Sequence, residues 1–203
     1  MTGLDARRIM SLETLSIRMV FFDMNRLELL HRLSPLEQRG VVVFTKGDLE
    51  KVFPEEQEKT LEKSLERMRR DELLVRAARG VYVFGPAVPR HRGWLIEHIA
   101  QALRPGDFNY VSLESILSEY GVISQIPMDR LTVMTTGARG LHHTSFGTIE
   151  FTHTRRSLPD LLERTMVVPG RPLRIAKKAA AVQDLRRVGR NLDLVDWEEV
   201  ADE

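Results

Sequence analysis

The sequence predicts an α+β protein, and two observations lead to this prediction. Between Thr45 and Gly85, two helix patterns separated by a proline precede two short β-type runs around a glycine. Beyond residue 93, helix patterns mix with runs of alternating hydrophobicity. The order of the first group is that of a winged helix-turn-helix, and the second group is typical of a mixed α+β domain.

The first helix pattern begins at Thr45, whose side chain suits an N-cap. Asp48, three residues later, is placed to complete a capping box. Pro54 ends the pattern, because the residue before a proline disfavours helical geometry. The apolar side of this helix consists of Leu49, Val52 and Phe53.

The second helix pattern runs from about Glu55 to about Asp71. Leu61, Leu65 and Met68 repeat with helical spacing and form its apolar face. Acidic residues open the helix and basic residues close it, which favours the helix dipole. The opposite face carries Lys59, Lys63, Arg67 and Arg70.

Two strands, Leu73–Arg76 and Val81–Phe84, follow with a glycine-containing bend between them. In a winged helix-turn-helix the second helix enters the DNA major groove and the hairpin lies along the backbone. Expected groove-facing residues are Lys59, Thr60, Lys63, Ser64 and Arg67, and expected phosphate contacts are Lys46, Arg70, Arg76 and Arg79. The alternative is an ordinary amphipathic helix with a solvated charged face beside an unrelated hairpin.

Domain boundaries follow from these patterns. Residues 1–24 form an N-terminal extension, for which we expect a helix, and residues 25–86 the DNA-binding domain. Its first helix pattern, Asn25–Leu33, is expected to be interrupted by Ser34-Pro35, and Gln38-Arg39-Gly40 to end the segment. A proline- and arginine-containing linker covers 87–93, so that residues 94–203 are expected to fold independently.

The second domain is expected to contain the following elements. The helix patterns are Trp94–Leu103, Leu113–Tyr120 with Ser112 as N-cap, 157–165, Ala176–Val188 and Asp196–Ala201; the strand patterns are Leu131–Thr136, Thr148–Thr154 and Leu173–Ile175. Residues 137–147 connect two of these strands and have room for a further short strand.

Charge is unevenly distributed along the chain. Residues 1–154 hold 20 basic and 20 acidic residues, residues 155–190 hold ten basic against three acidic, and residues 191–203 hold six acidic and no basic. The basic block indicates a second contact surface for DNA or an acidic protein, made of Arg171, Arg174, Lys177, Lys178, Arg186, Arg187 and Arg190. The alternative is a structural role, in which the acidic tail folds beside the block.

Composition excludes several classes of protein. The chain has no cysteine, which excludes disulfides and thiolate metal sites and is compatible with the cytoplasm. No apolar run is long enough to cross a bilayer, and the N-terminus lacks the pattern of a secretory signal. We therefore expect a cytoplasmic protein without a membrane partner.

The sequence offers no catalytic or metal-binding motif. GxSxG, GxGxxG, the P-loop and HExxH are all missing. His142, His143 and His153 invite a metal site, but His153 alternates with Ile149 and Phe151, which favours a structural role. We expect no enzyme activity, no catalytic residue, no metal and no cofactor.

Several segments resemble the AbiEi family of antitoxins from bacterial type IV toxin–antitoxin systems. These are RGVYVFGP at 79–86, YVSLESILSEYGVISQIP at 110–127, LTVMTTG at 131–137, GTIEFTHT at 147–154 and AKKAAAVQDLRRVGRN at 176–191. They follow the order of that family over about residues 25–195. This chain departs from the family in about twenty further residues before the first DNA-binding helix and in a more basic 176–188 helix.

The resemblance implies that the winged-helix domain represses its own operon by binding double-stranded operator DNA. It also implies that the C-terminal domain acts as an antitoxin against a nucleotidyltransferase-like toxin. Two other interpretations remain: a ligand-responsive winged-helix regulator without a toxin partner, and a nucleic-acid-processing enzyme that uses the histidines at 142–153.

Overall fold

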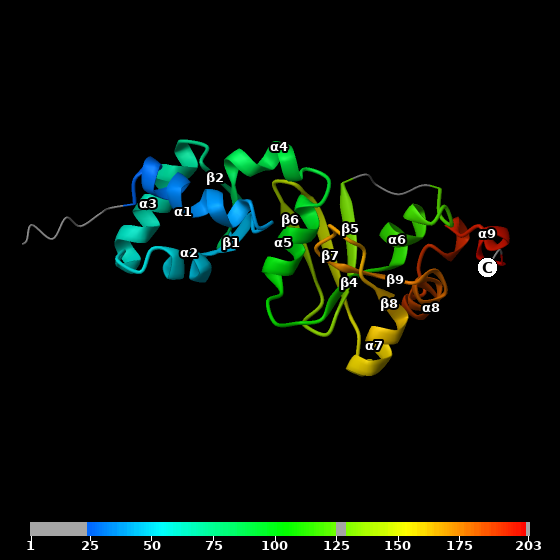
Figure 1. Ribbon diagram of the computed structural model, residues 1–203. Helices are drawn as coiled ribbons and strands as arrows, with labels where there is room; N and C mark the ends of the chain where they lie inside the picture. The colour runs from blue at the N-terminus through cyan, green and yellow to red at the C-terminus, as the bar shows by residue number, and fades with distance from the viewer. Residues whose placement is uncertain (1–23, 125–128, 202–203) are drawn as a thin grey trace, which may run out of the picture.

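The computed structural model describes residues 24–124 and 129–201 of the chain and has a mixed α+β fold (Figure 1). The expectation for residues 1–24 lies outside the described residues except for Met24. A small N-terminal unit with its own sheet lies at one end of the molecule, and a larger sheet with helices on both faces forms the rest (Figure 1).

The N-terminal unit packs three helices against a three-stranded antiparallel sheet. Its strands are in the order β1-β3-β2, so the last strand of the unit lies in the middle. In chain order the elements are α1 (Arg26–Glu37), β1 (Val43–Thr45), α2 (Lys46–Val52), α3 (Glu58–Arg70), β2 (Leu74–Ala78) and β3 (Val81–Phe84).

The start of α2 confirms the capping box predicted from the sequence. The Thr45 side chain accepts a hydrogen bond from the Asp48 backbone N–H at 3.1 Å, and the Asp48 carboxylate accepts one from the Thr45 backbone N–H at 2.9 Å. Two N–H groups that have no partner within the helix are thereby satisfied. The cap fixes the point at which the chain leaves β1 and turns into α2.

The predicted interruption of α1 at Ser34-Pro35 is wrong, whereas the predicted end of the segment at Gln38 is confirmed by its place as the C-cap. The helix contains Pro35 and continues to Glu37. A proline deprives only one carbonyl of its helical hydrogen bond, and near the end of a helix few such bonds remain to be lost. Buried Leu29 and Leu33 hold this helix on the core.

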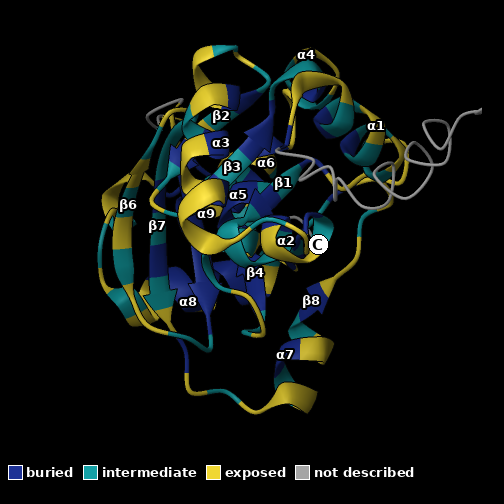
Figure 2. Ribbon diagram, turned by 90° about the vertical axis from the view of Figure 1, so that its left-hand side faces the viewer, coloured by how far each residue is buried: buried dark blue, intermediate teal, exposed yellow. Residues whose placement is uncertain are grey.

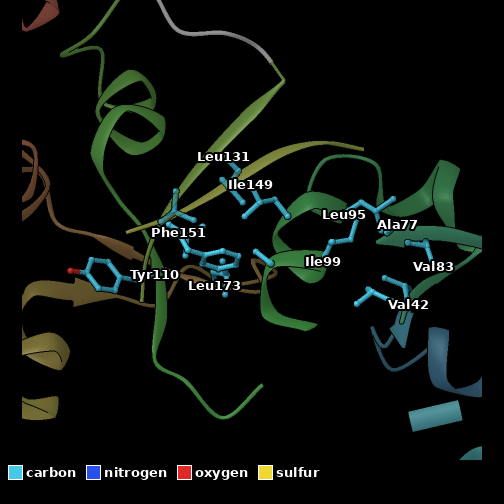
Figure 3. Close-up of a cluster of buried hydrophobic side chains, with 14 of the residues drawn as sticks. Val42, Ala77, Val83, Leu95, Ile99, Tyr110, Leu131, Ile149, Phe151 and Leu173 are labelled. Carbon is cyan, nitrogen blue, oxygen red and sulfur yellow. The ribbon is translucent and has the colours of Figure 1, made fainter. Parts of the chain in front are cut away.

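A helix packed between the two sheets joins the two parts of the molecule, together with hydrogen bonds from Ser145 to the Arg76 and Ala77 carbonyls. Where the sequence predicts a linker, the chain forms a 3-10 turn, Gly85–Ala87, and the short helix α4 (Val88–His91). The following helix, α5 (Leu95–Leu103), lies between the two sheets. Figure 3 shows Leu95 and Ile99 of α5 between two groups of buried residues. Val42, Ala77 and Val83 belong to the N-terminal unit, and Leu131, Ile149, Phe151 and Leu173 lie in or next to strands of the larger sheet.

The hydrophobic core is thus continuous across the predicted domain boundary, and independent folding of 94–203 is no longer expected. Removing the N-terminal unit would expose the side of α5 that packs on β1 and β3. Exposed apolar surface of this kind destabilises the remaining fragment and favours its association.

We therefore expect Ile99→Ala to destabilise both parts together. Ile99 is fully buried, and truncating such a side chain costs about 2–5 kcal/mol. Calorimetry should show one unfolding transition in the wild type and one transition at lower temperature in the variant. Two separate transitions, with only one of them shifted, would contradict a shared core.

The larger sheet has six strands in the order β6-β7-β5-β4-β9-β8. The pairs β5–β7 and β4–β9 are parallel, and the other neighbours are antiparallel. The strands are β4 (Asn109–Val111), β5 (Arg130–Thr135), β6 (Gly140–Thr144), β7 (Gly147–His153), β8 (Thr165–Met166) and β9 (Arg174–Ala176). Two of them, β4 and β8, have no counterpart in the sequence prediction because they span only three and two residues.

Helices cover both faces of this sheet. One face carries α5, and the other carries α6 (Leu113–Glu119) and α8 (Lys178–Val188) (Figure 1). The helix α7 (Leu158–Arg164) connects β7 to β8, and α9 (Trp197–Ala201) lies beside α8 at the end of the molecule away from α1 to α3 (Figure 1). None of the helices in the described ranges is long and apolar enough to cross a membrane.

Candidate nucleic-acid interface

The exposed face of α3 carries most of the cations predicted to meet DNA. Lys59, Lys63, Arg67 and Arg70 follow one another at spacings of four, four and three residues, which places them on one side of the helix. With Glu62 and Glu66 they line a shallow surface groove of about 590 Å³. The buried side of α3 holds Leu61, Leu65 and Met68, as the helical spacing predicts.

Carboxylates of α3 are balanced within the N-terminal unit. The Glu62 carboxylate accepts a hydrogen bond from Lys46 Nζ at 2.8 Å, and Glu66 pairs with Arg69 at 2.7 Å. These hydrogen bonds lower the pKa of both glutamates, so that both stay ionised and partnered. Lys59 and Lys63, in contrast, form no ion pair within the described residues, which leaves two uncompensated charges on the outer face of α3.

The glutamates that precede and open α3 are also partnered. Glu55 pairs with Arg32 at 2.7 Å, Glu58 pairs with Lys46 at 3.0 Å, and Glu56 accepts a hydrogen bond from the Met24 backbone N–H. Each carboxylate thus holds another part of the unit in place. Glu55 and Glu58 thereby face a cation, with Lys46 shared between Glu58 and Glu62, whereas Glu56 accepts hydrogen bonds from two neutral donors, the Met24 N–H and the Ser64 hydroxyl.

Lys46 is placed differently from the prediction. Its ammonium group lies between Glu62 and Glu58, and hydrogen bonds to these two carboxylates raise its pKa. The lysine therefore links the start of α2 to α3 instead of standing free for a phosphate. This position is a correction to its predicted role.

Ser64 is a second correction, because its side chain is buried and cannot face a groove of DNA. Its hydroxyl hydrogen-bonds to the Glu56 carboxylate at 3.3 Å. Position 64 lies between the buried Leu61 and Leu65, on the side of α3 that faces the core. Thr60 remains exposed, and Arg67 keeps an exposed position while donating to the Met24 carbonyl at 2.6 Å.

The β2–β3 hairpin holds the other two predicted phosphate contacts. Arg76 on β2 and Arg79 in the bend are exposed, and neither forms an ion pair within the described part of the chain. Gly80 completes the bend with φ +72°, which glycine adopts without strain. Its carbonyl accepts a hydrogen bond from the Lys46 backbone N–H at 2.8 Å, which joins the hairpin to the start of α2.

The predicted second basic surface is not one surface. The side chain of Arg171 is only 3% exposed and pairs with Glu97 at 2.7 Å and Glu119 at 2.6 Å. Arg190 pairs with Glu114 at 2.8 Å and also with Glu150. Arg171 and Arg190 therefore form ion pairs within the protein, and their prediction as part of a surface for an external anion is corrected.

The other five residues of the predicted basic surface also differ in exposure and in their partners. Arg174 lies on β9, where its guanidinium donates to the Thr165 hydroxyl at 2.8 Å and carbonyl at 3.0 Å. Lys177, Arg186 and Arg187 are exposed, and Lys178 is half-buried. Of the seven predicted residues, these four stay available for an external anion.

The part of the acidic tail that the structure describes forms no ion pair with the basic block. Within the described residues, Asp193, Asp196, Glu198 and Glu199 pair with no basic side chain. The tail contacts α8 through Trp197, whose ring lies 4.7 Å from the Arg186 guanidinium carbon. A cation–π contact of this kind attaches α9 without cancelling the charge of the arginine.

A buried polar cluster at Asp184 has no counterpart among the predicted site residues. Asp184 lies on α8 and is fully buried; its carboxylate accepts hydrogen bonds from the Tyr110 hydroxyl at 2.9 Å and the Ser112 hydroxyl at 3.0 Å. Burial and the neighbouring Asp184 charge raise the pKa of Tyr110, so its hydroxyl stays protonated. Arg156 and Arg164 lie 3.7 and 3.6 Å from the other carboxylate oxygen.

This cluster also explains a wrong prediction about Ser112. The serine precedes α6 as expected, but its side chain makes no capping hydrogen bond to that helix. Its hydroxyl binds Asp184 instead. A partner 72 positions away in the sequence outcompetes the local one.

The three histidines of the β6–β7 hairpin do not gather at one point. His142 and His143 are neighbours on a strand and therefore face opposite sides of the sheet. His142 lies 3.1 Å from Arg104, and His153 donates a hydrogen bond to the Gly137 carbonyl at 2.7 Å. In the described ranges no group of three metal-ligating side chains is close enough to hold an ion.

Comparison with protein-family models, with curated proteins and with solved structures finds no match to this chain.

Proposed function

We propose that residues 24–84 form a winged helix-turn-helix that binds double-stranded DNA. One observation carries the proposal: the order α1-β1-α2-α3-β2-β3, with strand order β1-β3-β2, leaves one face of α3 and the hairpin bend exposed. In this motif the second helix of the helix-turn-helix reads the major groove, and the hairpin contacts the backbone.

Residue roles follow from exposure and partners. Lys59, Thr60, Lys63 and Arg67 are proposed to face the major groove, and Arg70, Arg76 and Arg79 to contact phosphates. Lys46 has a positioning role, because its charge is committed to Glu58 and Glu62. The N-terminal unit holds 12 basic and 11 acidic residues between positions 24 and 84. Affinity is therefore expected to depend on the local arrangement of exposed cations, not on the total charge.

We further propose that the protein is a cytoplasmic antitoxin that represses its own operon. Support comes from the resemblance to AbiEi antitoxins of the segments quoted between residues 79 and 191, of which 79–86 contains β3 of the N-terminal sheet and the later ones contribute β4, β5, β7, α6 and α8. The proposed partners are operator DNA and a nucleotidyltransferase-like toxin encoded beside it. No catalytic role is proposed for any residue.

Two measurements test the two halves of this proposal separately. Co-expression with the adjacent gene should relieve growth arrest if the antitoxin assignment is correct. Binding to DNA from upstream of the gene should be measured with the purified protein. If DNA binds but no neighbouring toxin is neutralised, the alternative of a ligand-responsive regulator is correct.

We expect Arg67→Ala and Arg79→Ala to weaken DNA binding in different ways. Loss of a base contact at Arg67 should cost about 1–3 kcal/mol on the operator and relax its specificity. Loss of a phosphate contact at Arg79 should weaken all DNA alike and reduce the salt slope by about one. Fluorescence anisotropy at several salt concentrations distinguishes the two effects. Wild-type affinity in both variants would exclude the proposed orientation.

A further inference from the structure

A groove on the larger sheet lies outside the proposed DNA interface. It has a volume of about 1090 Å³ and lies over β6, β7 and the end of α8. Figure 2 shows β6 and β7 at one margin of the sheet. The groove is lined by Arg130, Ala138, Arg139, Gly140, Leu141, Glu150, Phe151, Thr152, His153, Arg155, Val188 and Arg190.

The floor of the groove is the part of the sheet that α8 leaves uncovered. Leu141 is paired with Glu150, and Glu150 with Thr132 of β5, so these side chains share one face. The same face carries Met134 of β5 and Tyr110, which is paired with Met134. Because the Tyr110 hydroxyl donates to Asp184 of α8, this is the face of the sheet on which α8 packs. Because β6 and β7 lie at the end of the sheet, the end of α8 forms one wall and the floor stays open.

Two positive charges in the lining of the groove are not compensated by ion pairs among the described residues. Arg190 and Arg130 neutralise Glu150 from both sides, with Arg130 at 3.3 Å, and Arg190 also pairs with the buried Glu114. These two arginines and two glutamates cancel. Arg139 and Arg155 are exposed and form no ion pair in the part of the chain that the structure describes. Two positive charges therefore remain beside the floor.

Local structure fixes one end of the groove. His153 Nδ1 donates a hydrogen bond to the Gly137 carbonyl at 2.7 Å, and the Gly137 N–H donates to the Thr135 hydroxyl at 3.0 Å. A Cβ at position 137 would lie 2.1 Å from the Asp107 carboxylate, so a larger residue there would require the Asp107 side chain to move. These contacts hold the segment before Arg139 against the ends of β5 and β7.

From this arrangement we infer that the groove binds the phosphate monoester of a small organic molecule. Such an ester carries a charge of about −1.5 to −2 at pH 7, which matches the two uncompensated arginines. Arginine also suits phosphate because its planar guanidinium donates two parallel hydrogen bonds. Leu141 and Val188 offer apolar surface to the organic part, and Thr152 and Glu150 offer polar groups to its hydroxyl or amino groups.

Features of the groove favour a small ester over a nucleic acid. Its volume of about 1090 Å³ is just above the range of about 300–1000 Å³ that is usual for small-molecule sites. The one phenylalanine in the lining, Phe151, is buried and cannot stack on the bases of a single strand. Glu150 on the floor, whose charge Arg130 and Arg190 neutralise, can accept hydrogen bonds from the hydroxyl or amino groups of a small molecule.

The test is calorimetric titration of the full-length protein with adenosine 5′-monophosphate, glucose 6-phosphate, inorganic phosphate and adenosine. We expect saturable binding of the phosphates and none of adenosine. Tighter binding of the adenine ester identifies a nucleotide site, and tighter binding of the sugar ester a sugar-phosphate site. Both results support the inference.

Variants locate the binding in the groove. R139Q/R155Q should weaken every phosphate about tenfold or more, because charge-assisted hydrogen bonds are lost. Arg92→Gln, an exposed arginine outside the groove with no ion pair in the described ranges, should leave the affinity unchanged. Leu141→Asn should weaken the organic ester about threefold and inorganic phosphate not at all, because only the organic part needs apolar surface.

Two results would overturn the inference. One is the absence of saturable phosphate binding by a protein whose thermal unfolding is normal. The other is a loss of DNA affinity in R139Q/R155Q with unchanged phosphate binding, which would assign the groove to nucleic acid. Neither result depends on whether α3 binds DNA, since Lys59 and Lys63 lie outside the groove.

Discussion

Replacing Arg171 by Met should lower the free energy of unfolding by about 3–5 kcal/mol, the usual cost of removing one partner from a buried ion pair. The Arg171 side chain lies between Glu97 and Glu119, and Glu97 is itself only 3% exposed. Without the guanidinium, a carboxylate would be left buried, where burial already raises its pKa. Urea denaturation at pH 7 measures the loss.

A matched control separates this effect from the general loss of an arginine. Arg187→Met removes an exposed arginine that forms no ion pair in the described residues, and should change stability by less than about 0.5 kcal/mol. The double variant R171M/E97Q should recover part of the loss, because the uncompensated buried charge is gone. If R171M alone were as stable as the wild type, the buried pair would have no structural role.

Asp184→Ala should have an effect of similar size, about 3–5 kcal/mol. The change removes the acceptor of the Tyr110 and Ser112 hydroxyls and leaves Arg156 and Arg164 without their buried carboxylate. Because these residues come from β4, α7 and the segments beside α6 and β7, the loss should disturb the packing of α8 on the sheet. Hydrogen exchange of α8 amides, measured together with urea denaturation, reports this directly.

The control for Asp184 is Asp193→Ala, a change of the same type at an exposed aspartate with no ion pair in the described part of the chain. It should leave stability within about 0.5 kcal/mol of the wild type. Asp184→Asn keeps an acceptor for the two hydroxyls and should fall between Asp184→Ala and the wild type. Equal stability of all three variants would mean that the polar cluster around Asp184 does not contribute to the stability of the fold.

Local signals predicted the elements of the N-terminal unit. The Thr45 cap, the Leu61, Leu65 and Met68 repeat and the bend at Gly80 depend on residues near one another in the sequence. Each of these patterns appears in the structure where the sequence places it. The start of α3 at Glu58, three residues after the predicted start, is an error of boundary and not of type.

It was harder to predict which charged side chains form ion pairs, because their partners lie far away in the sequence. Arg171 meets Glu97 across 74 positions, and Arg190 meets Glu114 across 76. The prediction put Ser64 with Lys63 and Arg67 on the exposed face, although its spacing of three residues from Leu61 and four from Met68 puts it on the buried side of the helix. The groove on the larger sheet was equally hidden, since it forms only when β6, β7 and the end of α8 come together.

The proposed DNA interface is tested most directly by a double variant of the two uncompensated lysines on α3. The account predicts that K59A/K63A lowers affinity for DNA from upstream of the gene at least tenfold and reduces the slope of log affinity against log salt by about two. R139Q/R155Q serves as the matched control, because it also removes two uncompensated charges, and should bind that DNA like the wild type. Unchanged affinity and salt slope in K59A/K63A, with the variant folded, would contradict the assignment of α3 as the DNA-binding helix.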